Sequence, residues 1–316
     1  MRTLKESRLR PYILVLAAGV IWGVTFSLAR LATEGGAHPL GLTFWQAFGG
    51  GLTLLAVCAI RRKWPVFSRS YLKFYLIVGS FGSVIPGTLF FYAAPHVPAG
   101  ILAITVATVP LMTYGASWLL RIDRFSIRRA SGIIVGLTAI VLLVVPESSL
   151  PEPAMAGWVL IVLLASVFYS AENLYVDVCI PANADMVALL AGALVVAGIL
   201  VLPIVLYLDA FVPLTGKWAQ TQWAIVAMAV VSSIAYTFFL LVVKSSGAVF
   251  ASQIGYVITL AGVLWGMVIF AEAHTAWAWL ALCLIMIGLV LVTPRERQYE
   301  KTEQGRHIVK EVNRPF

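Results

Sequence analysis

Ten apolar runs, each about 17–25 residues long, follow one another along the chain and are separated by polar residues or by Pro and Gly. A run of this length crosses the hydrocarbon core of a bilayer as an α-helix. The runs lack the alternating pattern, about ten residues per strand, of a membrane β-barrel. We therefore predict an all-α integral membrane protein with ten transmembrane helices. The predicted spans, numbered first to tenth below, are 12–33, 39–60, 72–94, 99–120, 127–146, 156–179, 184–207, 221–243, 248–270 and 276–293.

Composition and charge agree with a membrane protein. Hydrophobic residues make up 61% of the chain and charged residues 11%, whereas a soluble domain has about 25% charged residues. The net charge is +8, but 20 of the 22 Lys and Arg residues fall on one side of the ten-span topology, and only Arg30 and Lys217 fall on the other. Basic residues concentrate on the cytoplasmic side of membranes. We predict a multi-pass protein of the cell inner membrane with both termini in the cytoplasm, in contact with membrane lipid and not with nucleic acid.

The two halves of the chain resemble each other weakly. A shift of 149 residues places Asp123 on Glu272, and one last apolar span follows each of these acids. The same shift superposes Ser83, Ile85, Thr88, Phe90 and Ala99 on Ser232, Ile234, Thr237, Phe239 and Ala248. Because five spans are an odd number, a repeat of five must run in the opposite direction the second time. We therefore predict two inverted five-helix repeats, an architecture that recurs in secondary transporters.

Several of these residues resemble the EamA-type families of the drug/metabolite transporter superfamily. The first span carries Ala-Ala-Gly-Val-Ile-Trp-Gly at 17–23, and acidic turns stand at Asp123 and Glu272. The family has Gly-Glu in these turns, whereas this chain has Ile-Asp in the first half and Ala-Glu in the second. Small residues follow in the next helices, at Gly132 and Ala139 and at Ala281 and Gly288.

The resemblance implies repeats at 12–146 and 156–293, a periplasmic linker at 147–155, and cytoplasmic tails at 1–11 and 294–316. It also implies a central cavity surrounded by the first, third, fourth, sixth, eighth and ninth spans. It does not indicate a substrate, because the superfamily moves amino acids, sugars, nucleotides and drugs.

Glu172 in the sixth span is the leading candidate for a functional residue. Placing a charged side chain at the bilayer centre costs from about 2.5 to above 10 kcal/mol. A charged residue inside a membrane span is therefore a candidate for a functional role. Ser166, Tyr169, Ser170, Asn173 and Asp177 form one polar face of this helix, and Glu172 lies at its edge. We interpret Glu172 as the site that binds a cationic substrate group or carries a coupling proton. The alternative is a structural carboxyl, paired with Lys244 or reaching the interface.

Other polar and aromatic residues complete the candidate substrate site. They stand on the first, fourth, sixth, eighth and ninth spans: Trp22, Thr25, Tyr114, Tyr169, Asn173, Ser232, Tyr236, Gln253 and Tyr256. Polar side chains between membrane helices also serve only to hold helices together, and that alternative stays open. Arg30 near the outer end of the first span is interpreted as a snorkelling side chain paired with Glu34 at i+4, or else as an outer site for an anionic group.

Breaks inside the spans point to kinks or hinges. The third span contains Gly79, Gly82, Pro86 and Gly87, and the fourth contains Pro110, which leaves a carbonyl without its usual donor. Either close packing with a static kink or a hinge for alternating access accounts for them.

These features favour a secondary-active transporter, an exporter or exchanger of a small metabolite or drug that works by alternating access. The sequence contains no phosphate-binding loop of the kind that would indicate ATP hydrolysis. A membrane-embedded enzyme acting on a lipid is the alternative, and it would need clustered catalytic groups that the sequence does not show. His38, His96 and His274 lack metal-ligand spacing. We expect no catalytic residue, metal or cofactor, and a monomer or homodimer.

Overall fold

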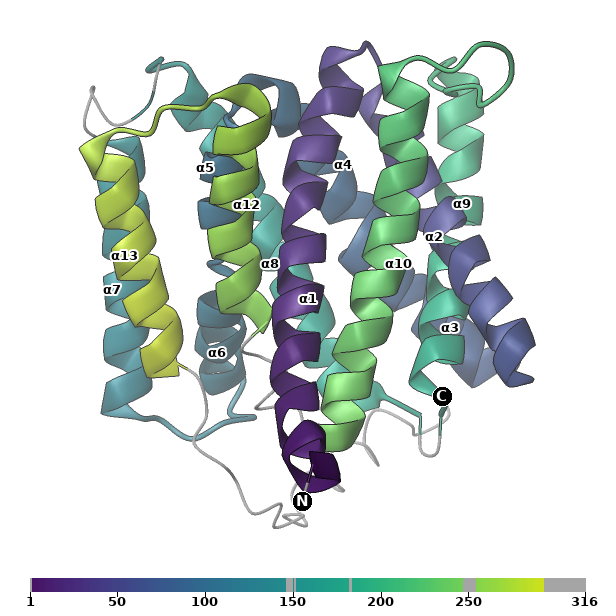
Figure 1. Ribbon diagram of the computed structural model, residues 1–316, viewed down its shortest axis with the longest axis horizontal. Coiled ribbons are helices and arrows are strands. Elements are labelled where there is room, and N and C mark those ends of the chain that lie inside the picture. The colour runs from purple at the N-terminus through teal and green to yellow at the C-terminus, as the bar shows by residue number, and fades with distance from the viewer. Residues whose placement is uncertain (1, 146–149, 151, 182–183, 247–253, 293–316) are drawn as a thin grey trace.

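The predicted apolar runs form helices at the expected places, but the third and fourth spans are broken. The computed structural model describes residues 2–145, 150, 152–181, 184–246 and 254–292, without the side chains of residues 2–9, 240 and 243–246 (Figure 1). The helices of the first half are α1 (Arg2–Glu34), α2 (Pro39–Arg61), α3 (Arg69–Gly79), η1 (Ser80–Val84), α4 (Ile85–Ala93), η2 (Ala94–His96), α5 (Ala99–Val106), α6 (Val109–Leu119) and α7 (Ile127–Val144). Those of the second half are α8 (Met155–Cys179), α9 (Met186–Tyr207), α10 (Gln220–Ser246), α12 (Ile254–Phe270) and α13 (Ala276–Val292).

The predicted spans match these helices closely. Within the described residues, eight helical stretches are long and apolar enough to cross a membrane, and the apolar helices α12 and α13 are shorter. The predicted first residues of the ninth span, 248–253, lie outside the described residues. The first helix begins at Arg2, so the predicted N-terminal tail continues the first span as helix.

Side chains and prolines at the helix starts explain several boundaries. Pro39 stands in the first turn of α2, where a missing N–H costs nothing, and His38 Nδ1 accepts a hydrogen bond from Leu40 N. Asp185 caps α9 by accepting from Ala188 N. The third span becomes α3, the π-helix η1 and α4, because Pro86 has no N–H for a regular α-helical bond.

The helices of the two halves interlock. In the first half α1 packs along α10 and α12, and in the second half α8 packs along α4 and α6. By the shift of the repeat these are corresponding pairs, since α1 corresponds to α8, α10 to α3–α4, and α12 to α5–α6. The start of α1 and the end of α13 lie at the same end of the molecule (Figure 1). We call the opposite end, which carries Arg30 and Glu34, the outer end.

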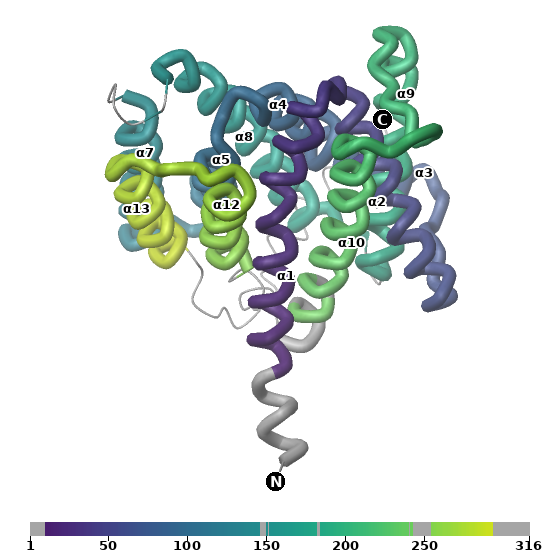
Figure 2. The backbone as a smooth tube through the Cα atoms, turned by 45° about the horizontal axis from the view of Figure 1, so that its top comes forward, coloured from purple at the N-terminus to yellow at the C-terminus, as the bar shows by residue number. Residues whose placement is uncertain are grey.

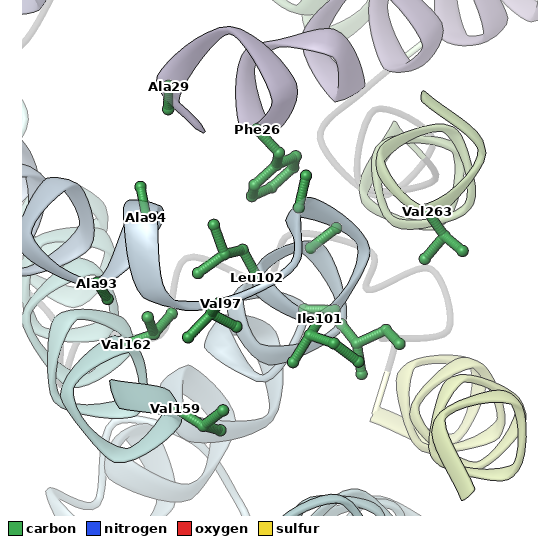
Figure 3. Packing of buried hydrophobic residues seen from close by; sticks show 14 of the residues in the cluster. Phe26, Ala29, Ala93, Ala94, Val97, Ile101, Leu102, Val159, Val162 and Val263 are labelled. Carbon is green, nitrogen blue, oxygen red and sulfur yellow. The ribbon is translucent and has the colours of Figure 1, made fainter. Parts of the chain in front are cut away.

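Two further helix pairs stand at the edges of the molecule. Figure 2 shows α7 beside α13 at one edge and α3 beside α9 at the other. The largest apolar core lies between α1, α5, α8 and α12, where small and branched side chains interdigitate (Figure 3). This core is built mainly of Ala, Val, Leu, Ile and Phe side chains, and it extends to α7 and α13.

Candidate functional site

The polar face of α8 changes its surroundings along the helix. Ser166 and Ser170 are buried, Tyr169 and Glu172 are half-buried, and Asn173 is exposed. The polar residues of this face therefore do not all line one common cavity. Ser166 and Ser170 are packed inside the bundle, whereas Tyr169 and Glu172 are partly accessible.

Glu172 lies against the π-helix of the third span. A Cβ atom added at Gly82 would stand 2.8 Å from Glu172 Cγ and 3.0 Å from Cδ, closer than real Cβ contacts allow. Glycine at this position therefore lets the carboxyl-bearing side chain lie directly on the backbone of η1. Short π-helical turns frequently occur at functional sites. The sequence showed Gly82 as a helix breaker, but no pattern in it indicated a contact with Glu172.

Aromatic rings from two other helices complete the surroundings of Glu172. Its carboxylate is close enough to Tyr169 and to Tyr236 of α10 to act electrostatically on both phenol groups. Tyr236 in turn contacts Trp22 of α1, with ring centroids 5.4 Å apart at an edge-to-face angle, and Phe239 at 5.6 Å. Helices α1, α8 and α10 and the π-helix η1 thus converge on one carboxyl group. A carboxylate beside aromatic faces attracts cations, and in an apolar setting it also takes up protons readily.

The serine and threonine hydroxyl groups of this region differ in whether the backbone already binds them. Thr25 Oγ1 donates to Trp22 O at 2.6 Å, and Ser166 Oγ donates to Val162 O at 3.1 Å. Ser170 Oγ and Ser232 Oγ are buried and have no hydrogen-bond partner among the described residues. These two hydroxyls remain able to donate to a ligand or to water, whereas Thr25 already donates its proton to the backbone.

Four predicted residues lie away from Glu172 or outside the described part of the chain. Tyr114 is buried near the turn between α6 and α7, where its hydroxyl accepts from Ser126 N at 3.0 Å and the Arg129 guanidinium stands 5.1 Å above its ring. Tyr256 is half-buried on α12 and packs against the main core. Gln253 and the side chain of Lys244 lie outside the described residues.

A second polar cluster, at the outer end, was only partly predicted. The expected pair is present, with Arg30 Nε 2.7 Å from Glu34 Oε1. Arg30 Nη1 also lies 2.6 Å from Oε1 of Glu272, an acid that the sequence indicated through the repeat and the family resemblance but not as a partner of Arg30. The anion that Arg30 binds here is therefore part of the chain itself.

The fold and the site together define a polytopic helical membrane protein that holds a carboxyl group inside its helix bundle. The model of the EamA-like transporter family matches residues 9–145 and, a second time, residues 156–293. The chain belongs to this family and is a membrane transporter. Its all-helical architecture is that of ten spans in two inverted five-helix repeats.

Known relatives agree with this assignment. The chain is 28% identical over 287 residues to the uncharacterized inner membrane transporter YedA of Escherichia coli K12, covering 88% of this chain and 89% of YedA. It is 24% identical over 137 residues to Protein PagO of Salmonella typhimurium, covering 43% and 45% of the two chains. The crystal structure of one further protein superposes with a TM-score of 0.60 at 18% identity, over 94% of this chain and 98% of that one, and shows the fold alone.

The relatives confirm two of the sequence expectations. The resemblance to the EamA-type families is confirmed by the family match over both halves. A multi-pass protein of the inner membrane is confirmed by the apolar helices and by the relationship to YedA.

Proposed function

We propose that the protein is a secondary-active transporter that exports or exchanges a small metabolite or drug by alternating access, with Glu172 as the residue that binds a cationic substrate group or carries a coupling proton. The observation that carries the proposal is the position of Glu172. Its half-buried carboxyl lies inside a membrane-spanning helix, against Gly82 and beside the phenols of Tyr169 and Tyr236.

The energetics of the bilayer support a role in transport. An ionised carboxylate in this position costs from about 2.5 to above 10 kcal/mol unless it is paired. No salt bridge to Glu172 is present among the described residues. A proton, or a cation that arrives from solution, would stabilise the carboxyl group in this position. Both are cargo that a transporter can release on the other side of the membrane.

Reconstituted protein in liposomes tests the proposal. Amino acids, amines, nucleosides and sugars are screened for uptake at two pH values, first with the unmodified protein. Glu172→Gln keeps the shape of the side chain and removes its charge. Because a hydrogen bond to a charged group contributes about 1.5–3 kcal/mol, we expect about a 10- to 100-fold loss of transport for a substrate found in the screen.

Asp177→Asn is the matched control. Asp177 lies on the same helix but is exposed, so the same loss of one carboxylate should leave transport within about twofold of the unmodified protein. Transport by Glu172→Gln at the unmodified rate and with the same pH dependence would contradict the proposed role of Glu172.

A further inference from the structure

Glu272 is a buried carboxylate at the outer end of the bundle. It lies in the turn between α12 and α13, and its side chain is only 6% exposed. Its Oε1 accepts from Arg30 Nη1 at 2.6 Å and from Ala99 N at 2.7 Å, and its Oε2 accepts from Gly100 N at 3.1 Å. Three donors thus compensate a charge that is removed from water.

The donors come from separate parts of the molecule. Arg30 belongs to α1, whereas Ala99 and Gly100 form the first turn of α5. The amides at a helix start have no partner within the helix and carry the positive end of its dipole, so a carboxylate is favoured there. Glu272 therefore ties the α12–α13 turn of the second half to two helices of the first.

The surrounding backbone is shaped for this contact. A Cβ atom at Gly266 would stand 2.5 Å from Glu272 Oε2, and one at Gly100 would stand 2.6 Å from His274 Nε2. Ala271, directly before Glu272, has a φ of 53°, in the left-handed region that alanine adopts only at a cost. The Arg30 guanidinium stacks over the ring of Phe270, with Arg30 Cζ 4.4 Å from the ring centroid. Glycines at 100 and 266 and a left-handed residue at 271 thus allow the Glu272 carboxylate to lie close to the backbone.

His274 lies beside Glu272 but does not carry the positive charge that faces it, which belongs to Arg30. Its side chain is 3% exposed, and Nε2 lies 3.5 Å from Glu272 Oε2 with no hydrogen-bond partner among the described residues. Burial lowers the pKa of His274, and the nearby Glu272 carboxylate opposes this without cancelling it. The imidazole is therefore neutral at pH 7.

The helices joined by Glu272 also close the outer half of the bundle. Directly inside the cluster, Phe26 and Ala29 of α1 face Ala94, Val97 and Leu102 in a fully packed apolar layer (Figure 3). Separation of α1 from the segment 94–102 would open this apolar layer to the outer side. Such a separation requires Glu272 to release either Arg30 or the start of α5.

We propose that Glu272 is the latch of an outer gate: bound to Arg30 and to the first turn of α5 it holds the outer end closed, and its release lets the transporter open outward. The proposal rests on the alternating-access function proposed above. In this role Glu272 is a positioning residue, since it controls which conformation is populated and does not contact substrate.

The test measures how often the buried layer opens to the outer side. Ala94, which is 0% exposed, carries the probe: the parent protein has the substitution Ala94→Cys and lacks Cys58, Cys179 and Cys283, and a membrane-impermeant maleimide is added from outside. Glu272→Gln keeps the side-chain shape and loses the charge. Ala99→Pro removes one donor to Glu272 without changing any charge, at a first helical position that tolerates proline.

Glu34→Gln is the matched control, because Glu34 also pairs with Arg30 but is exposed and has no hydrogen bond to α5 among the described residues. We expect both Glu272→Gln and Ala99→Pro to speed maleimide labelling at position 94 about tenfold, since each weakens charged hydrogen bonds that exist only in the closed state. The Glu34→Gln protein should label within about twofold of the parent. Unchanged labelling in both test variants, or equal acceleration in Glu34→Gln, overturns the proposal. If Glu272→Gln does not fold, the result of Ala99→Pro decides alone.

Labelling needs no substrate, so this experiment is independent of the transport assay. If Glu172→Gln transports at the unmodified rate while Glu272→Gln and Ala99→Pro label faster, the latch stands and the proposed role of Glu172 is removed. If labelling is unchanged in Glu272→Gln and Ala99→Pro but Glu172→Gln has a transport defect, the proposed role of Glu172 stands and the latch is removed.

Discussion

At the scale of single residues, Asp185 shows how one carboxylate can stabilise a helix start and a helix end together. It caps α9 through Ala188 N, and it receives two hydrogen bonds from Arg61 at the end of α2, at 2.9 and 2.7 Å. Lys63 Nζ lies 3.3 Å away. Burial alone would raise the pKa of Asp185, but these hydrogen bonds outweigh it and hold the pKa below its usual value.

Two substitutions separate the roles of Asp185. Asp185→Asn keeps an acceptor for the helix cap and loses the ion pairs, whereas Asp185→Ala loses both. Loss of an N-cap costs about 0.5–2 kcal/mol, and an exposed ion pair contributes less than about 1 kcal/mol. We therefore expect the alanine variant to unfold at a lower temperature than the asparagine variant in detergent, and both to unfold below the parent at pH 7.

The pH dependence follows from the lowered pKa of Asp185. A carboxylate with a lowered pKa stabilises the folded state above its unfolded pKa of about 3.9, and that contribution disappears as the pH falls through the folded value. The difference between the parent and Asp185→Asn should accordingly be full at pH 7 and shrink as the pH falls below about 4. An asparagine variant as unstable as the alanine variant would mean that the ion pairs, and not the cap, hold this junction.

The Glu172 site and the Glu272 cluster differ in how far the sequence predicted them. Glu172 was found because a carboxylate inside an apolar run needs an explanation, and Tyr236 because it lies on a polar stripe of its helix. Their closeness to Gly82, and the pair formed by Arg30 and Glu272 across the two halves, depend on tertiary packing. No spacing along one helix encodes such contacts.

At the scale of helices, the two broken spans follow from proline. In the fourth span α5 ends at Val106 and α6 begins at Val109, one residue before Pro110. The break was predictable, because Pro110 cannot donate to the preceding turn. The π-helical form of residues 80–84 was not, since the same Gly and Pro residues are compatible with a simple kink.

The pair of α7 and α13 depends on glycine at its crossing. A Cβ atom at Gly288 would stand 2.9 Å from Gly132 O, and one at Gly132 would stand 2.9 Å from Gly288 O. Both obstacles are backbone atoms, so neither can rotate away. Small residues let membrane helices approach this closely.

Gly288→Ala should therefore destabilise the protein by about 1–3 kcal/mol, the usual cost of overpacking. Gly157→Ala is the control, because nothing lies within 4 Å of its added methyl group. The same substitution in an open helical position is neutral or slightly stabilising. Thermal unfolding in detergent compares the two, and equal melting temperatures would show that the α7–α13 contact can relax.

At the scale of the whole molecule, the place of the two termini and the distribution of basic residues predict one orientation in the membrane. The start of α1 and the end of α13 lie at the same end of the molecule, opposite the end that carries Arg30 and Glu34 (Figure 1). The sequence places 20 of 22 basic residues on the side of the termini. The repeat and the span count were predictable, because both follow from hydrophobic length, whereas the pairing of α1 with α10 and of α8 with α4 needed the structure.

Reporter fusions test this orientation. A fluorescent protein that folds only in the cytoplasm should be active after residue 316, and alkaline phosphatase, which is active only outside, should be active when inserted beside Lys217 between α9 and α10. The excess of positive charge on the terminal side predicts this result for an inner-membrane protein. The opposite pair of activities would reverse the orientation and would place Arg30 and Glu272 on the cytoplasmic side.

The packing of α1 on α10 and α12 also bears on how the chain is made. The partners of α1 are synthesised roughly 200 residues after it, at about 5–20 residues per second, so α1 waits in the bilayer for tens of seconds before its partners arrive. During that interval its inward face has only the first half of the chain to cover it. In that interval the face of α1 that later packs on α10 and α12 lies against lipid or against the first half of the chain.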